Sequence, residues 1–251
     1  MLRARLTTLL SAAALAATSL SLNAGTVANP QASQRPFGLQ PISSVQVSGS
    51  DARAAEFNST MLPQFLQICE DNLQESVVFQ QRSGFKLDAS KLFLRQNADK
   101  PIRIYYIMEG AGYWNSLGFT ITSAGASNNS GSPFLIYPNA SQGSSRTSNE
   151  PLQTGDFVEI GTGSAGFQLD FFLISDGARN GQTWLYNDKS RNSDGLQHVV
   201  AFLIPGSRYV MIGFEDIVGG GDLDYNDLVF VVDIGAENAL CLDAETDCLP
   251  H

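Results

Sequence analysis

The chain has 251 residues, of which 25 are acidic and 15 are basic, so its formal net charge is −10. This charge excludes nucleic acid as an expected partner and disfavours anionic lipid, because both are bound through patches of Lys and Arg. The length suffices for the core of one domain without obligatory disulfides. Three cysteines and two histidines supply no ordinary set of zinc ligands.

Residues 1–24 have the pattern of a secretory signal peptide. Arg3 and Arg5 precede an apolar run that continues to Leu22, and Leu22–Ala24 and Thr26–Ala28 both end in a small residue that signal peptidases accept. The run is short and rich in Ala, Ser and Thr, whereas a membrane span needs about 20 apolar residues. We therefore expect a secreted or periplasmic protein with no membrane span in its mature part.

The region before residue 100 is expected to be mostly helix and irregular chain. Residues 25–58 are rich in Ser, Gln, Ala and Pro, which predicts a linker or a loosely ordered arm. Residues 59–100 are expected to hold one helix over Ser59–Glu75, followed by a leading strand region. Pro63 suits the first turn of this helix. The apolar residues at helical spacing are Leu62, Phe65, Leu66, Cys69 and Leu73.

Residues 101–236 predict an all-β domain. Short runs of β-branched and aromatic residues alternate with turns rich in Gly, Asn and Ser, and no helical pattern separates them. The predicted fold is an antiparallel β-sandwich of the jelly-roll or Ig-like type, with a barrel as the alternative. The predicted strands cover residues 102–108, 119–122, 134–137, 156–160, 167–174, 198–204, 209–214 and 228–234.

Residues 237–251 are expected to form a C-terminal tail. In an oxidising compartment Cys241 and Cys248 could close a small disulfide loop. Cys69 would then be buried or paired elsewhere, and the spacing leaves the connectivity open.

The densest polar segment is the loop from Glu215 to Asp227, which lies between two apolar strands. Five carboxylates and one carboxamide crowd this single connection: Glu215, Asp216, Asp222, Asp224, Asn226 and Asp227. Like charges this close repel one another unless the loop is splayed into water or a cation neutralises it. Calcium takes six to eight oxygens from such groups, so these six residues are the predicted ligands of a calcium ion.

The loop differs from an EF-hand, although Asp222, Asp224 and Asn226 alternate like its first three ligands. Asp227 stands where an EF-hand needs Gly, and a strand follows in place of a helix. Asp233 falls at the twelfth place, but that strand would carry it away from an ion. The alternative to calcium binding is an acidic, solvated turn.

Three stretches resemble a family of secreted bacterial domains known as domain of unknown function 4114, which is related to LruC-like domains. They are Glu109–Phe119, Phe171–Gly177 and Gly213–Phe230, and their order matches the family. The resemblance covers about residues 100–235. It implies an exported, often surface-associated β-sandwich module.

Other motifs are interpreted as structural. Gly161–Gly166 fits the pattern Gly-x-Gly-x-x-Gly but leads into a strand, so a hairpin turn is favoured over a dinucleotide site. His198 begins an apolar strand and has no activated Ser or Cys beside it. Asn115 is interpreted as stabilising a local turn, with contact to the ion as the alternative. Asp176 and Asp194 stand in Asp-Gly pairs typical of turns.

The leading functional hypothesis is a non-enzymatic, calcium-binding β-sandwich module with a structural, adhesive or surface-associated role. Its expected partners are calcium and either a glycan or a surface protein. The first alternative is a calcium-assisted carbohydrate-binding module, for which Trp114 and Trp184 could supply aromatic surface. An exported hydrolase ranks lower, because the sequence offers no pair of nucleophile and base.

Overall fold

The computed structural model describes residues 35–80, 86–88, 92, 94, 97–123, 131–143 and 152–243. The predicted signal peptide, the linker as far as residue 34, and Cys248 lie outside these residues. Among the described residues, no helix is long and apolar enough to cross a membrane.

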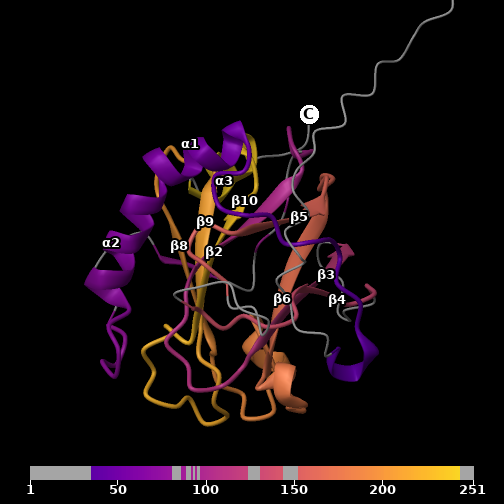
Figure 1. Ribbon diagram of the computed structural model, residues 1–251, viewed down its shortest axis with the longest axis vertical. Helices are drawn as coiled ribbons and strands as arrows, with labels where there is room; N and C mark the ends of the chain where they lie inside the picture. The colour runs from indigo at the N-terminus through magenta and orange to yellow at the C-terminus, as the bar shows by residue number, and fades with distance from the viewer. Residues whose placement is uncertain are drawn as a thin grey trace, which may run out of the picture.

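The described strands form two antiparallel sheets (Figure 1). The six-stranded sheet has the order β1 (Lys86–Leu87), β8 (Val199–Leu203), β9 (Tyr209–Phe214), β10 (Leu228–Asp233), β2 (Ile102–Met108) and β5 (Phe157–Gly161). The four-stranded sheet has the order β4 (Phe134–Tyr137), β3 (Ser116–Ser123), β6 (Phe167–Ser175) and β7 (Thr183–Tyr186). The two sheets pack face to face, which confirms the predicted antiparallel β-sandwich.

The six-stranded sheet is buried on both faces. Its inner face packs against the four-stranded sheet, and Phe230 of β10 meets Phe171 of β6 with ring centroids 5.2 Å apart. Its outer face packs against helices α1 (Ala52–Thr60) and α2 (Leu62–Asn72), as Figure 1 shows. Burial on both faces explains why β2 and β10 consist of nearly continuous apolar residues instead of alternating with polar ones.

The sequence located most strands closely. The predicted ranges 102–108, 134–137 and 209–214 coincide with β2, β4 and β9. The short strand β7 was missed, and β1 lies within residues 59–100, where a leading strand was expected without defined bounds. β7 has four residues, three of them only partly buried, and β1 has two, so neither carries a long periodic pattern.

The N-terminal predictions need correction. The single helix over Ser59–Glu75 is two helices with a break at Met61, where Pro63 opens the second one. The first helix begins at Ala52, because the side chain of Asp51 accepts a hydrogen bond from the Ala54 amide and caps it. The prediction of a loosely ordered arm is therefore wrong for residues 52–58. Only two residues of α1 are buried, so its sequence carries little periodicity.

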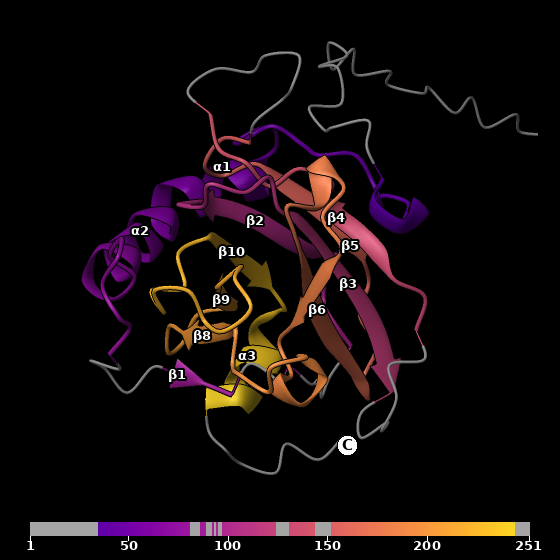
Figure 2. The same cartoon turned by 90° about the horizontal axis from the view of Figure 1, so that it is seen from below.

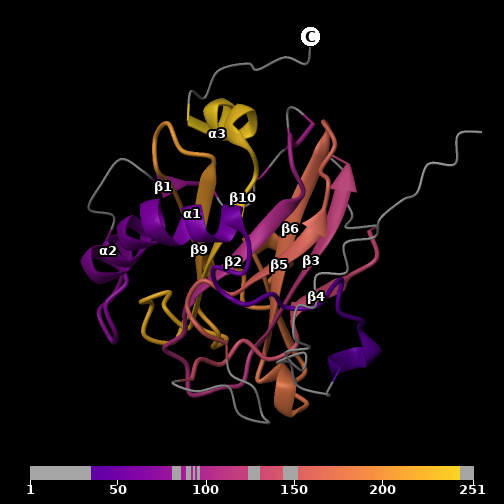
Figure 3. The ribbon, with the colours of Figure 1, turned by 45° about the horizontal axis from the view of Figure 1, so that its top comes forward.

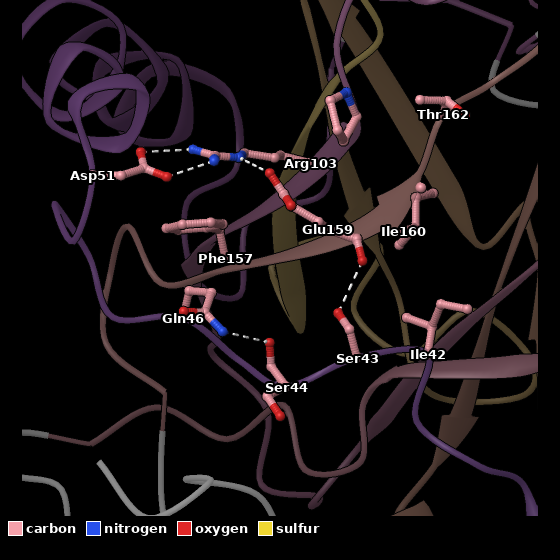
Figure 4. A pocket seen from close by; sticks show the side chains of 12 residues that line it. Ile42, Ser43, Ser44, Gln46, Asp51, Arg103, Phe157, Glu159, Ile160 and Thr162 are labelled. Carbon is pink, nitrogen blue, oxygen red and sulfur yellow. Dashed lines mark hydrogen bonds and ion pairs between the residues drawn. The ribbon is translucent and has the colours of Figure 1, made fainter. Parts of the chain in front are cut away.

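Arg103, which is buried, and Arg53, which is partly buried, fasten α1 to the sheet. Arg103 of β2 contacts Asp51 at 2.6 Å and Glu159 of β5 at 2.8 Å, as Figure 4 shows. Arg53 of α1 contacts Asp233 at the end of β10 at 2.6 Å. Each guanidinium group is held by hydrogen bonds to carboxylates, of which Asp233 is buried while Asp51 and Glu159 are 44% and 41% exposed.

The stretch Gly161–Gly166 is not a hairpin turn. It joins β5 in one sheet to β6 in the other, so it crosses the sandwich. Gly163 packs so tightly that a Cβ there would overlap the side chains of Leu94 and Ile102. Close packing, and not phosphate binding, therefore accounts for a glycine at this position.

One of the two described cysteines is free and the other is disulfide-bonded, which agrees with the possibilities that the sequence left open. Cys69 of α2 is free and buried against the sheet, and its Sγ lies 3.9 Å from Met211 Sδ. Cys241 is disulfide-bonded and belongs to helix α3 (Ala236–Asp243). The region predicted as a C-terminal tail from residue 237 is thus helical as far as Asp243.

We predict that Phe57→Ala destabilises the whole domain by about 3–5 kcal/mol. Phe57 is fully buried and its ring stacks on Tyr105 with centroids 3.9 Å apart, so truncation opens a cavity between α1 and the sheet. Urea unfolding followed by tryptophan fluorescence measures the change, with the exposed neighbour Glu56→Ala as the control. A loss no larger in Phe57→Ala than in the control would contradict the assignment of α1 to the domain core.

Candidate metal centre

The acidic loop connects the two best-buried neighbouring strands. β9 ends at Phe214 and β10 begins at Leu228, and these two residues are register partners. Glu215–Asp227 therefore leaves and re-enters the sheet at one point, at the lower end of the molecule in Figure 1. The strand pairing forces the acidic residues at both ends of the loop together.

The backbone of the loop is tightly coiled. Leu223 and Tyr225 have φ values of 61° and 58°, in the left-handed region that non-glycine residues rarely adopt. These positions alternate with Asp222, Asp224 and Asn226. Left-handed conformations at non-glycine residues cost about 1–2 kcal/mol each, so the surrounding contacts must hold them in place.

A first group of carboxylates comprises Glu215, Asp216 and Asp227. One oxygen of each lies within 4.8 Å of the others. Glu215 and Asp216 are buried, and the Asp216 amide donates to Asp227 Oδ2 at 2.9 Å. Glu215 also accepts from the Leu223 amide at 3.1 Å, which ties the middle of the loop to its start.

Burial raises the pKa of each of these three carboxyl groups. The negative charge of Asp222 adds to the rise at Glu215, and that of Asp216 adds to the rise at Asp227. No Lys, Arg or His in the described part of the chain forms an ion pair with them. The carboxylates are therefore poorly stabilised in their charged form by the protein alone.

A second group comprises Glu75, Asp222 and Asp224, again with one oxygen of each within 4.8 Å of the others. Asp224 is buried and accepts from the Ser76 amide at 2.8 Å. Glu75 follows the end of α2 and is far from the loop in sequence. The end of the helical layer thus contributes to the acidic site.

Asn226 links the second group to the start of the β2–β3 connection. Its Nδ2 donates to Asp224 Oδ2 at 2.9 Å and to Glu75 Oε2 at 3.3 Å. Its carbonyl oxygen accepts from the Gly110 amide at 3.0 Å. A Cβ at Gly110 would overlap Asn226 Oδ1, so only glycine allows this close approach.

Asn115 belongs to the site, and its interpretation as a local turn residue is wrong. It is fully buried, donates to Asp216 Oδ2 at 2.7 Å and accepts from the Asp176 amide at 3.0 Å. Asp176 has a φ of 50°, and its Oδ1 accepts from the Trp114 amide at 2.8 Å. The Asp-Gly pair at this position therefore does more than turn the chain, because it orients Asn115 toward the first group.

Glu109 is a further acidic residue beside the site. Burial, with a smaller contribution from the charge of Asp216, raises the pKa of Glu109 to about 7. Its Oε2 accepts from the Gln142 amide at 3.0 Å. As an isolated carboxylate after a strand, it carries no sequence signal that would have pointed to the loop.

His198 and Asp194 hold the loop from its other side. His198 is fully buried, with Nε2 2.8 Å from Asp194 Oδ2 and Nδ1 3.2 Å from the Glu215 carbonyl oxygen. The same Asp194 oxygen accepts from the Gly219 amide at 2.8 Å. Backbone hydrogen bonds from Gly219 and Leu196, above all, hold the pKa of Asp194 well below its usual range. These contacts fit the structural interpretation of His198.

The structure corrects the predicted ligand set in one respect. The six residues were expected to surround one ion, but Asp222 and Asp224 lie in one group and Asp227 in the other. Glu75 joins the second group. Asp233 lies at the far end of β10 from the loop, as expected, and pairs with Arg53 and Arg208.

A separate cavity of about 570 Å³ lies beside β5, between the arm at residues 42–46 and the sheet (Figure 4). Its charged side chains are Arg103, Asp51 and Glu159, and they are bonded to one another. These charges are occupied in fastening α1, so this cavity is not the candidate site.

A family model described as "Domain of unknown function (DUF4114)" matches residues 164–235. The resemblance to that family is confirmed over these residues. No curated protein and no solved structure matches the chain. The matched region runs from just before β6 to the end of β10 and contains the whole acidic loop, whereas Glu75, Glu109 and Asn115 lie outside it. The relation to LruC-like domains stays a prediction.

We predict that, in a metal chelator, the free energy of unfolding falls as the pH rises from about 4 to about 7. Glu109 binds its proton more tightly in the folded protein, so its contribution is complete below the unfolded pKa and is lost as the pH passes the folded pKa of about 7. Glu109→Gln should flatten this decline, and Glu70→Gln, at an exposed position on α2, should not. Urea titrations at several pH values measure the slopes. Equal slopes in both variants would contradict the assignment.

We predict that Gly110→Ala weakens the loop while leaving the sandwich folded. The added methyl group displaces Asn226, which carries contacts to Asp224 and Glu75. The expected loss is about 1–3 kcal/mol, from overpacking and lost hydrogen bonds. Gly112→Ala is the matched control, because a Cβ at Gly112 meets no atom. Hydrogen exchange of the loop amides should rise only in Gly110→Ala.

Proposed function

We propose that this protein is an exported, calcium-stabilised β-sandwich module with a structural or surface-associated role and no catalytic activity. The observation that supports it most is the pair of acidic groups at one end of the sandwich. In each group, one oxygen of each of three carboxylates lies within 4.8 Å of the others. Among the described residues, no cationic side chain belongs to either group. A bound cation removes both the desolvation penalty and the mutual repulsion of these groups.

The ligand atoms favour calcium over other divalent ions. All six carboxylates offer oxygen, and no Cys or described His lies among them. Calcium accepts six to eight oxygens in irregular geometry, so three carboxylates with backbone carbonyls and water satisfy it. Magnesium requires near-octahedral geometry and keeps more of its water, which suits two crowded carboxylate groups less well.

An ion in each group would join segments that are distant in sequence. The first group lies against Asn115, at the start of β3, and the second lies against Glu75, after α2. Binding would therefore couple the helical layer, the β2–β3 connection and the β9–β10 loop. Because the unfolded chain lacks this arrangement, the binding free energy adds to the stability of the fold.

The carbohydrate-binding alternative has weaker support. Trp184 contacts Phe172 and Phe37 with ring centroids 4.6 Å and 5.2 Å apart, and Arg191 covers the Tyr186 ring at 3.6 Å. Rings in such contacts offer less free surface for stacking on a sugar. We therefore retain the structural role as the proposal.

We predict that calcium at about 100 times its dissociation constant adds about 2.7 kcal/mol to the stability, which raises the melting temperature by about 5–10 °C. Asp216→Asn and Asp224→Asn should each reduce the shift, because they disable different groups. Glu70→Gln should keep it. Thermal unfolding in EGTA and in calcium measures the shift, and calorimetric titration gives the number of ions.

Equal melting temperatures of the wild-type protein in EGTA and in calcium would refute calcium binding. Loss of the shift in Asp216→Asn alone would restrict the ion to the first group. A shift that magnesium reproduces at the same concentration would contradict the preference for calcium.

A further inference from the structure

The end of the sandwich that carries the acidic loop also carries exposed aliphatic side chains. Ile217 and Val218 are each 46% exposed, Leu196 is 42% exposed and Leu223 is 36% exposed. We call these four residues the apolar rim. Leu196 and Leu223 both lie beside Gly220, which belongs to the same loop that carries Ile217 and Val218. Exposed apolar groups gathered at one place on a folded protein mark an interaction surface.

Basic side chains flank the same end. Arg179 lies on the 3₁₀ turn η3 (Gly177–Arg179), and Lys189 and Arg191 lie on η4 (Lys189–Arg191). Arg191 and Val218 line a common pocket, and Asp176, which precedes η3, orients Asn115 in the site. Figure 1 shows the gold loop and the orange turns together at the bottom of the molecule, and Figure 2 shows this end face on.

Arg179 and Lys189 are more exposed than the arginines that pair with acids elsewhere in the fold. Arg53, Arg103 and Arg208 each contact a carboxylate within 3.1 Å. Arg179 is 47% exposed and lies 3.8 Å from its nearest carboxylate, and Lys189 is exposed. Arg179 also lies over the Trp114 ring at 3.9 Å. Within the described residues, solvent-exposed positive charge thus adjoins the apolar rim although the whole chain is acidic.

We propose that this end of the protein binds anionic phospholipid membranes in a calcium-dependent manner. Without calcium, the acidic groups repel an anionic surface, as the net charge of −10 implies. With calcium, most of the negative charge of the two carboxylate groups is neutralised, and lipid phosphate oxygens complete the coordination of the ions. Arg179 and Lys189 then pair with headgroups, and the apolar rim enters the interfacial region of the bilayer.

A membrane suits the rim better than a protein groove does. Ile217 and Val218 are adjacent, exposed aliphatic residues of the loop, and a bilayer accepts such side chains without a matching groove. Shallow insertion of a few aliphatic side chains together with headgroup contacts is the way peripheral proteins hold a bilayer. This inference rests on the proposed calcium binding for its ion dependence and on the rim for its partner.

The test is co-sedimentation of the purified protein with phosphatidylglycerol–phosphatidylcholine vesicles and with pure phosphatidylcholine vesicles, in calcium and in EGTA. We expect binding only to the anionic vesicles and only in calcium. Ile217→Ser/Val218→Ser should weaken binding at least about tenfold, because two aliphatic side chains no longer enter the bilayer. Arg179→Gln/Lys189→Gln should weaken it by about tenfold and reduce its salt dependence.

Leu240→Ser is the matched control. Leu240 is 52% exposed on α3, which lies at the opposite end of the molecule from the loop, as Figure 3 shows. This substitution should leave vesicle binding unchanged. Equal losses in Leu240→Ser and in Ile217→Ser/Val218→Ser would overturn the assignment of the rim.

Calorimetric titration of calcium alone into the same proteins separates the two proposals. Calcium binding without vesicle binding would overturn the membrane inference and leave the calcium-stabilised module intact. Binding to an anionic polysaccharide instead of vesicles would likewise overturn the membrane inference and leave the calcium-stabilised module intact. If calcium does not bind at all, the proposed function fails, and vesicle binding that persists in EGTA would overturn the calcium dependence stated here.

Discussion

The constraint on which the site depends is the burial of several carboxyl groups where the paired strands β9 and β10 end. Phe214 and Leu228 are register partners in the centre of the larger sheet, so Glu215 and Asp227 cannot move apart without breaking that pairing. Burial raises the pKa of both carboxyl groups, and the neighbouring acids raise it further. The apolar strands on either side thereby create an electrostatic conflict that only protons or a cation relieve.

Both ends of the helical layer, formed by α1 and α2, are tied to the rest of the fold. The N-terminal end of α1 is held to the sheet by Arg53 and Arg103, and the segment after α2 delivers Glu75 to the acidic site. Because α1 and α2 cover the outer face of the larger sheet, their position is set by the apolar core beneath them. The geometry of the second carboxylate group therefore depends on packing some distance away from it.

The proposed calcium sites and the proposed membrane surface share one end of the sandwich for a physical reason. Strands and helices use their side chains for the core, whereas the connections at the strand ends are free to carry charges and exposed aliphatic groups. A cation at the loop would lower the local negative charge and hold in place the backbone that carries Ile217 and Val218. The two proposals are thus coupled through the same short segment, although separate residues carry them.

The sequence alone determined the sandwich class, most strand positions and the acidic loop, because these depend on local alternation and on the composition of one contiguous segment. The break at Met61, the capped start of α1 and the short strand β7 carry too little periodicity to be read from the sequence. Only the tertiary structure divided the six predicted ligands into two groups and brought Glu75, Glu109 and Asn115 beside them. Each of these three residues lies about a hundred residues or more before the loop, so only strand pairing and helix packing set its distance from the loop.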